Sequence, residues 1–281
     1  MLNLRITLQR VSAIALIAVI FSSCAPESSE VTPDEITDDV LAKFENLGFN
    51  LDDIHIINER NPLTNESEKF YVLEGDIKVP EQQLSDMLDS EIFHTGVVGE
   101  QYRTNNLVSN NQTITVLGYT GGSNALDNTM RTALQWAVNN YNALNIGLNF
   151  TLAFGTNYPA YDMVVYRVSG GGGGSAGFPS GGNPYKFIQI QSGTSGFGTN
   201  TTEHVITHEM GHCLGLRHTD YFNRSLSCGT GGNEGSGGVG AILIPGTPSG
   251  FDANSVMLSC FSANEDGEFG NFDVVALEYL Y

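Results

Sequence analysis

The chain has 281 residues and 41% hydrophobic content, enough for one large domain or two small ones with a real core. It carries 31 acidic and 12 basic residues, a net charge of −19, which argues against a nucleic-acid partner because proteins that bind a phosphate backbone are basic. The excess of acid favours a solvated surface, with calcium sites as the functional alternative.

The first residues are typical of an export leader. Two arginines precede an apolar run of 11 residues, 11–21, which is too short to cross a bilayer but suits a signal peptide. The run leads into Ser-Ser-Cys24, which resembles a bacterial lipobox, although Phe21 stands where leucine is usual. We predict residues 1–23 as a signal peptide of lipoprotein type and Cys24 as a lipidation site, with simple secretion as the alternative. The chain would then be exported and anchored to the bacterial outer membrane or cell surface.

Residues 24–34 are polar and are interpreted as a tether, and residues 35–112 as an N-terminal region that could serve as a pro-region. In this region we expect a helix over 34–49, a strand over 69–79 and a helix that begins at Pro80. No chemistry is indicated here. His55 and His94 have no partner at ligand spacing and are interpreted as structural or exposed.

The pattern becomes sharper after residue 112. Strands are expected over 113–119, 148–154, 162–168 and 186–191, and a run of five glycines, 170–174, is interpreted as a flexible loop. An amphipathic helix lies between the first two strands, because apolar residues recur at helical spacing: Met130, Ala133, Leu134, Ala137, Val138 and Tyr141. Residues 271–281 again follow a helical stripe.

A further helix is expected from Thr201 to Leu214. Asn200 and Glu203 are spaced like a capping box, and Gly215 is placed to end the helix. This helix carries most of a segment that holds three of the six histidines of the chain, HEMGHCLGLRH (208–218).

The spacing of these histidines predicts a metal site. His208 and His212 are four residues apart and project from nearly the same side of a helix. Gly215 can reverse the chain so that His218 approaches the same point. Catalytic zinc takes three protein ligands and keeps a fourth position open for water, and Glu209 would lie beside that position. His204 is interpreted as structural or as a support to the ligands, because a fourth histidine would fill the open position.

The segment HEMGHCLGLRH fits HExxHxxGxxH, the zinc signature of the metzincin metalloendopeptidases. The longer stretches SAGFPSGGNPYKFIQI and HVITHEMGHCLGLRHTDYFNRS resemble the bacterial M57 group, the dual-action HEIGH metallopeptidases. The resemblance implies an α+β, metzincin-like fold over residues 113–281. Such a fold has a twisted mixed β-sheet with an antiparallel edge strand, a backing helix and an active-site helix, then a C-terminal subdomain with a Met-turn and a terminal helix.

The resemblance also implies roles for residues outside the helix. Met257 would form the Met-turn beneath the metal. Some metzincins have a tyrosine two residues after that methionine, but this chain has Ser259, so the role is vacant or taken by another residue such as Tyr221. A substrate peptide would add as an extra strand to the edge strand formed by Ser175, Ala176, Gly177, Phe178 and Pro179.

Three cysteines remain after Cys24. Cys213 follows a metal ligand and is expected to point into the core. Cys228 and Cys260 lie in segments that should converge beneath the metal, which favours a Cys228–Cys260 disulfide, with Cys213–Cys228 as the alternative.

These observations predict a monomeric zinc endopeptidase with one catalytic Zn²⁺, in which metal-activated water attacks peptide bonds of extracellular proteins and Glu209 is the general base. Its partners would be protein or peptide substrates, with no nucleic acid and with membrane contact only through Cys24. A non-catalytic surface lipoprotein that uses the same fold for adhesion or ligand binding is the alternative. A third reading is a latent zymogen in which residues 25–112 block the cleft through an aspartate or a backbone segment, since no inhibitory cysteine is evident there.

Overall fold

The computed structural model describes residues 36–46, 49, 51, 53–86, 101–232, 242–247 and 250–281. The predicted signal peptide, the tether, Cys24 and His94 lie outside the described residues. Within the described residues, no helix combines the length and apolar character that a membrane crossing requires.

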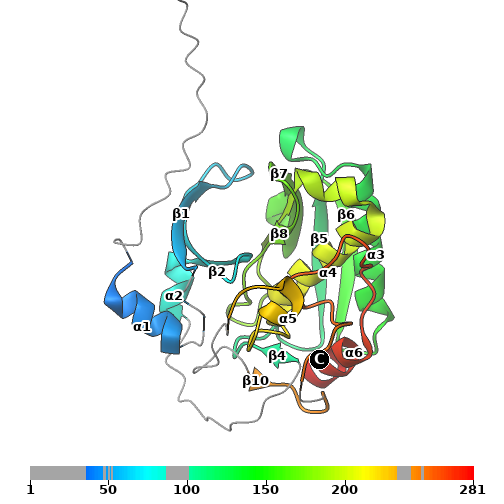
Figure 1. The fold of residues 1–281 in the computed structure, drawn as a ribbon. Coiled ribbons are helices and arrows are strands. Elements are labelled where there is room, and N and C mark those ends of the chain that lie inside the picture. Colours follow the sequence, from blue (N-terminus) through cyan, green and yellow to red (C-terminus); the bar gives the residue numbers. More distant parts are fainter. Residues whose placement is uncertain are drawn as a thin grey trace, which may run out of the picture.

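A five-stranded sheet in the order β6–β5–β7–β9–β8 forms the centre of the molecule (Figure 1). Four strands run parallel to one another: β5 (Gln112–Tyr119), β6 (Leu148–Gly155), β7 (Met163–Val168) and β9 (Phe187–Gln191). The short β8 (Gly174–Ser175) pairs antiparallel with β9 at the edge. The predicted mixed sheet with an antiparallel edge strand is confirmed.

Two long helices cover one face of this sheet. The helix α3 (Asn128–Ala143) buries all six residues of the predicted apolar stripe, and Asp127 caps it by accepting a hydrogen bond from Met130 N. Residues of α3, of the neighbouring α4 (Thr199–Leu214) and of the strands form one core cluster with Ile114, Val116, Ile188 and Ile190. The opposite face of the sheet carries a smaller cluster around Leu117, Val164 and Tyr166.

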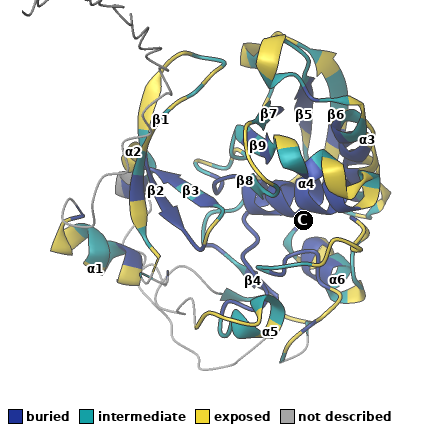
Figure 2. Ribbon diagram, turned by 45° about the horizontal axis from the view of Figure 1, so that its top comes forward, coloured by how far each residue is buried: buried dark blue, intermediate teal, exposed yellow. Residues whose placement is uncertain are grey.

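The helix α4 is buried without interruption from Thr201 to Leu214 (Figure 2). The predicted capping box is wrong, because the helix begins after Gly198 and has no side-chain cap. Glu203 instead accepts a hydrogen bond from Asn140 Nδ2 of α3 at 2.9 Å. Gly215 ends the helix with a left-handed φ of 106°, as its sequence position predicts.

Shorter elements complete the C-terminal part. They are the 3-10 turns η2 (Gly122–Asn124), η3 (Tyr158–Ala160) and η4 (Ser192–Phe197), the short helix α5 (Ser225–Cys228) and the terminal helix α6 (Asn271–Leu280). The two-residue strand β4 (Tyr102–Arg103) pairs with β10 (Ile242–Leu243), and Val108 belongs to the main core. Residues 101–112 therefore pack with the segment expected to form the catalytic domain.

The remaining described elements form what we call the N-terminal unit: α1 (Asp38–Asn46), β1 (His55–Arg60), β2 (Ser67–Leu73), β3 (Ile77–Pro80) and α2 (Glu81–Asp86). Its strands make a separate antiparallel sheet in the order β1–β2–β3. The prediction of one strand over 69–79 is wrong, because β2 and β3 are separated by a turn at Glu74, Gly75 and Asp76. Glu74 and Gly75 have φ values of 56° and 93°, which reverse the chain so that Leu73 pairs with Ile77.

Candidate metal centre

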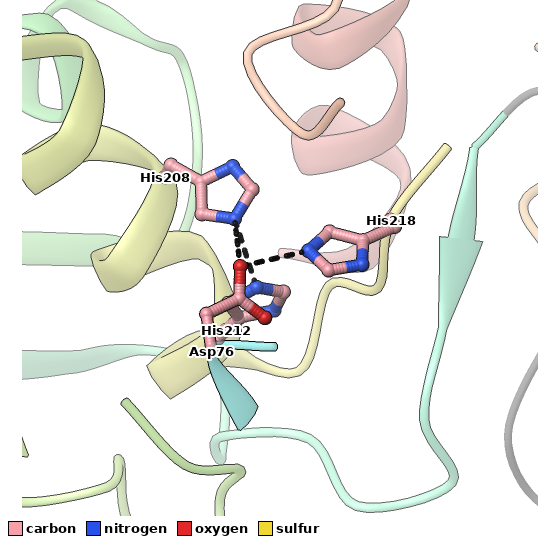
Figure 3. A group of neighbouring side chains, drawn as sticks. All are labelled: Asp76, His208, His212 and His218. Atoms are coloured by element: carbon pink, nitrogen blue, oxygen red, sulfur yellow. Dashed lines mark hydrogen bonds and ion pairs between the residues drawn. The ribbon is translucent and has the colours of Figure 1, made fainter. Parts of the chain in front are cut away.

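The three predicted histidines converge in the structure. His208 and His212 project from α4, and the turn at Gly215 brings His218 to the same place (Figure 3). The Nε2 atoms of His208 and His212 are 3.0 Å apart. All three residues are buried, with 0 to 2% of their surface exposed.

Backbone carbonyls set the orientation of two of these rings. His208 Nδ1 lies 2.8 Å from Val256 O, and His212 Nδ1 lies 2.9 Å from Leu216 O. Because a carbonyl oxygen can only accept, each Nδ1 must carry the proton, and each Nε2 presents a lone pair to the centre. Two lone pairs at 3.0 Å repel unless a cation lies between them.

The donor set fits zinc. Zinc–nitrogen bonds of about 2.0 to 2.1 Å at tetrahedral angles place the nitrogens roughly 3.3 Å apart. Burial, and then the neighbouring His208 and His218, hold the pKa of His212 well below its ordinary value. The neutral imidazole is the form that binds a metal.

A fourth donor, Asp76, comes from the turn between β2 and β3. Its Oδ2 lies 3.2 Å from His218 Nε2 and 3.5 Å from His208 Nε2, and the four donor atoms lie within 4.8 Å of one another. Burial raises the pKa of Asp76, but the imidazoles of His218, His208 and His212 outweigh it and keep that pKa well below the usual range. Asp76 is not among the residues predicted from the sequence, because the turn sequence Glu-Gly-Asp lies within the predicted strand over 69–79.

Glu209 lies beside this cluster and faces β8. A Cβ atom at Gly174 would be 2.7 Å from Glu209 Cγ and Oε1, so only glycine at position 174 leaves room for this side chain. At least the last of the five glycines therefore shapes the site and does more than make a flexible loop. Burial, followed by the charge of Asp76, raises the pKa of Glu209 well above its ordinary value. Within the described part of the chain, Glu209 Oε2 has no hydrogen-bond partner.

Met257 packs beneath α4. A Cβ atom at Gly211 would be 2.5 Å from Met257 Sδ, so the glycine of HEMGH allows this contact. Thr219 N donates a hydrogen bond of 2.9 Å to Met257 O, and Val256 O receives the bond from His208. The turn is thus attached both to His208 on the helix and to the segment after His218.

Asp273 of α6 holds this turn in place. Its Oδ2 accepts hydrogen bonds from Val256 N and Gly270 N, each at 2.9 Å. Its Oδ1 accepts from Ser255 Oγ and Gln101 Nε2, each at 2.7 Å. The terminal helix therefore supports the metal site through the buried carboxylate of Asp273. The sequence pattern there shows only an apolar helical stripe and does not reveal this role.

Ser259 stands where some metzincins have a tyrosine, so that position brings no phenol group to the site. Its backbone N and its Oγ each donate to Asp220 Oδ1 at 2.9 Å, and Ser227 Oγ donates to the other oxygen of Asp220. Tyr221 packs against Tyr102, with ring centroids 4.2 Å apart, and under the guanidinium of Arg217. Its ring is thus engaged with Tyr102 and Arg217.

The three cysteines of the described chain, together with His55 and His204, lie outside the cluster. Cys228 and Cys260 form a disulfide, while Cys213 is a buried free thiol whose pKa is raised by burial. His204 Nδ1 lies 2.8 Å from Asp266 O, and burial and then His208 lower its pKa to about 4. His55 is exposed on β1.

Only Ser175 of the predicted edge strand lies in a strand, β8. The next residue, Ala176, pairs with the N-terminal unit: Lys78 N donates to Ala176 O at 2.8 Å and Ala176 N donates to Asp76 O at 3.2 Å. Phe178 is buried in the core of that unit. The edge to which a substrate was expected to add is therefore paired with β3 of the same chain.

A cavity of about 220 Å³ reaches the site from the glycine-rich loop. It is lined by Asp76, His208, Glu209, Ser259 and residues 172–174, among others. A larger cavity of about 360 Å³ lies elsewhere along α4, near Glu203, and includes none of the four clustered donors.

A helix with the pattern HExxHxxGxxH, packed above a turn at a methionine, is typical of metallopeptidases. The family model for the dual-action HEIGH metallo-peptidases matches residues 71–281, so the match includes the turn that carries Asp76. The chain belongs to this family of metallopeptidases.

Two solved structures of myroilysin also match. One is 13% identical with a TM-score of 0.40, over 63% of this chain and 82% of the other. The second is 14% identical with a TM-score of 0.41, over 68% of this chain and 98% of the other. In a comparison with curated proteins, none matched.

Proposed function

We propose that the protein is a zinc-dependent endopeptidase in which Glu209 is the general base. The observation that carries this proposal is the position of Glu209, buried at the edge of three convergent imidazoles with one carboxylate oxygen unpartnered within the described residues. The family establishes a metallopeptidase, and the geometry supports the particular metal and the role of this carboxylate.

His208, His212 and His218 would hold the metal, since a ring nitrogen of each lies in one cluster of donor atoms. A bound zinc ion would supply Lewis acidity, polarising the scissile carbonyl and lowering the pKa of water.

Glu209 would take the proton of the attacking water and pass it to the leaving amine. Such acid–base assistance contributes typically about 10² to 10⁴ in rate. The close approach of Gly174 keeps the carboxylate on the side of the cluster that faces the cavity. The substrate would be a protein segment in extended form, bound by main-chain hydrogen bonds along residues 175–179. The leader-like residues 1–24 support substrates outside the cytoplasm.

Hydrolysis of casein by the zinc-loaded full-length chain tests this proposal. Because Asp76 lies among the imidazoles, the wild type and Asp76→Ala are assayed side by side. We expect that Asp76→Ala, with or without the wild type, releases peptides from casein. A chelator should abolish this hydrolysis, and added zinc should restore it. If both proteins hold one zinc per chain and neither cleaves casein, the proposal is wrong and the non-catalytic binding protein is the better reading.

A further inference from the structure

The position that Asp76 occupies is the one a hydrolytic zinc site leaves open. Three histidines fill three corners of a tetrahedral site, and water or substrate takes the fourth. Asp76 Oδ2 reaches into the cluster opposite α4, 3.2 Å from His218 Nε2 and 3.5 Å from His208 Nε2 (Figure 3). A carboxylate oxygen is an ordinary zinc ligand, so the four side chains form a closed set of donors.

The turn that carries Asp76 is fixed by a second buried contact. Glu74 pairs with the guanidinium of Arg217, the residue just before His218, and both side chains are fully buried. Glu74 Oε2 also lies 3.7 Å from His218 Nδ1. Glu74 has a φ of 56°, a conformation that side-chain-bearing residues rarely adopt, so the contacts around it hold the turn in this shape.

The strand that follows Asp76 covers the edge beside the metal. Ile77 and Ala176 form a parallel bridge through the bonds Lys78 N to Ala176 O and Ala176 N to Asp76 O. Gln83 Nε2 of α2 donates to Phe178 O at 2.9 Å. Main-chain groups of residues 176 and 178 are thus engaged, and a substrate strand cannot add there at the same time.

Aromatic packing holds the N-terminal unit in place. Phe178 enters the core of that unit, and its ring centroid lies 6.1 Å from that of Phe49 and 5.7 Å from that of His212. The guanidinium of Arg217 stacks over the ring of Phe49 at 4.8 Å. The unit therefore packs directly on Arg217, which precedes His218, and it meets the ring of His212 through Phe178.

The proposed reaction needs a water molecule at the metal and a peptide at the edge strand, and these contacts exclude both. Asp76 fills the position that water needs, and β3 fills the edge that a peptide needs. Glu209 remains in place beside them with Oε2 unpartnered in the described chain, as expected for a base whose water is excluded.

We propose that Asp76 is a displaceable fourth ligand to the metal and that the N-terminal unit thereby holds the peptidase in a latent state. This inference rests on the proposed zinc endopeptidase. The alternative that the geometry also allows is a permanent four-ligand metal site with a purely structural role.

Binding of acetohydroxamate, a small zinc chelator, tests the proposal without relying on catalysis. The cavity beside Asp76 and Glu209 gives such a probe access while β3 still covers the edge. If Asp76 occupies the fourth position in about 99% of molecules, a ligand that needs this position binds about 100-fold more weakly than it would bind to the open site. We therefore expect calorimetry on the zinc-loaded full-length chain to show hydroxamate binding at least about 10-fold tighter in Asp76→Ala than in the wild type. Asp76→Asn keeps the shape of the side chain but is a poorer metal ligand, so its hydroxamate affinity should lie between those of the wild type and Asp76→Ala. It replaces Asp76→Ala in this test if that variant folds badly.

Asp39→Ala is the matched control, because it removes an exposed aspartate from α1 of the same unit. It should leave hydroxamate affinity and casein hydrolysis at the wild-type level, whereas Asp76→Ala should cleave casein at least about 10-fold faster than the wild type. Equal hydroxamate affinity in wild type and Asp76→Ala, or loss of zinc from Asp76→Ala, would overturn latency and favour the structural site. Tighter hydroxamate binding without any casein cleavage would support Asp76 as a displaceable ligand and count against the proposed endopeptidase instead.

Discussion

Glu209→Gln, made in the Asp76→Ala background, is expected to lower casein hydrolysis by two or more orders of magnitude while zinc content stays at one per chain. The amide keeps the size and shape of the side chain but cannot accept the proton of the attacking water, a contribution typically worth about 10² to 10⁴ in rate. Glu209 is outside the cluster of converging donors, so metal binding should not change. Elemental analysis and the initial rate of peptide release measure the two quantities on the same sample.

Glu203→Gln is the matched control for this substitution. Glu203 lies six residues earlier on the same helix, and its Oε1 accepts a bond from Asn140 that glutamine can also accept. Its rate should stay within about threefold of the parent, since it touches none of the metal donors. A Glu209→Gln variant that cleaves casein as fast as its parent would show that another group accepts the proton.

Asp273→Asn is expected to lower the free energy of unfolding by about 3 kcal/mol or more. The new amide would turn a donor toward Val256 N and Gly270 N or toward Ser255 and Gln101, and each buried donor left unsatisfied costs about 1 to 3 kcal/mol. Because Val256 O also orients His208, zinc affinity should fall as well, by about 10- to 100-fold, the usual effect of losing a support to a ligand. Urea unfolding and competition with a zinc indicator measure these changes.

Asp162→Asn is the control that separates the effect of burial from the effect of losing a carboxylate. Asp162 Oδ2 also accepts a backbone N–H and a hydroxyl, both from Thr115, but it is exposed. Its substitution should cost less than about 1 kcal/mol and leave zinc affinity unchanged, because water can replace the lost bonds. Similar costs at residues 162 and 273 would argue against Asp273 as the support of the methionine turn.

The parts of the site that the sequence predicts are those contained in one local pattern. His208, His212 and His218 are brought together by the helix period and by a glycine turn, both of which are readable over eleven residues. The four parallel strands β5, β6, β7 and β9 and the helix α3 were also predicted to within a few residues, since each carries its own apolar period. Such patterns depend on contacts near in sequence.

The residues that the sequence did not reveal depend on contacts far along the chain. Asp76 lies 132 residues before His208, and nothing near Asp76 in the sequence shows that its turn meets the helix. A clue was available in Gly75, flanked by acids within an apolar run, which is a turn signal that splits the predicted strand. Asp273 has the same difficulty, because a single acid on a helical stripe looks exposed until its donors at Val256 and Gly270 are known.

Anomalous diffraction at the zinc edge, from crystals of the zinc-loaded full-length wild type, tests the four-ligand site most directly. We expect one zinc per chain, within about 2.2 Å of the Nε2 atoms of His208, His212 and His218 and of a carboxylate oxygen of Asp76. A zinc peak elsewhere would contradict it. So would a peak among the three imidazoles with Asp76 turned away and water in the fourth position.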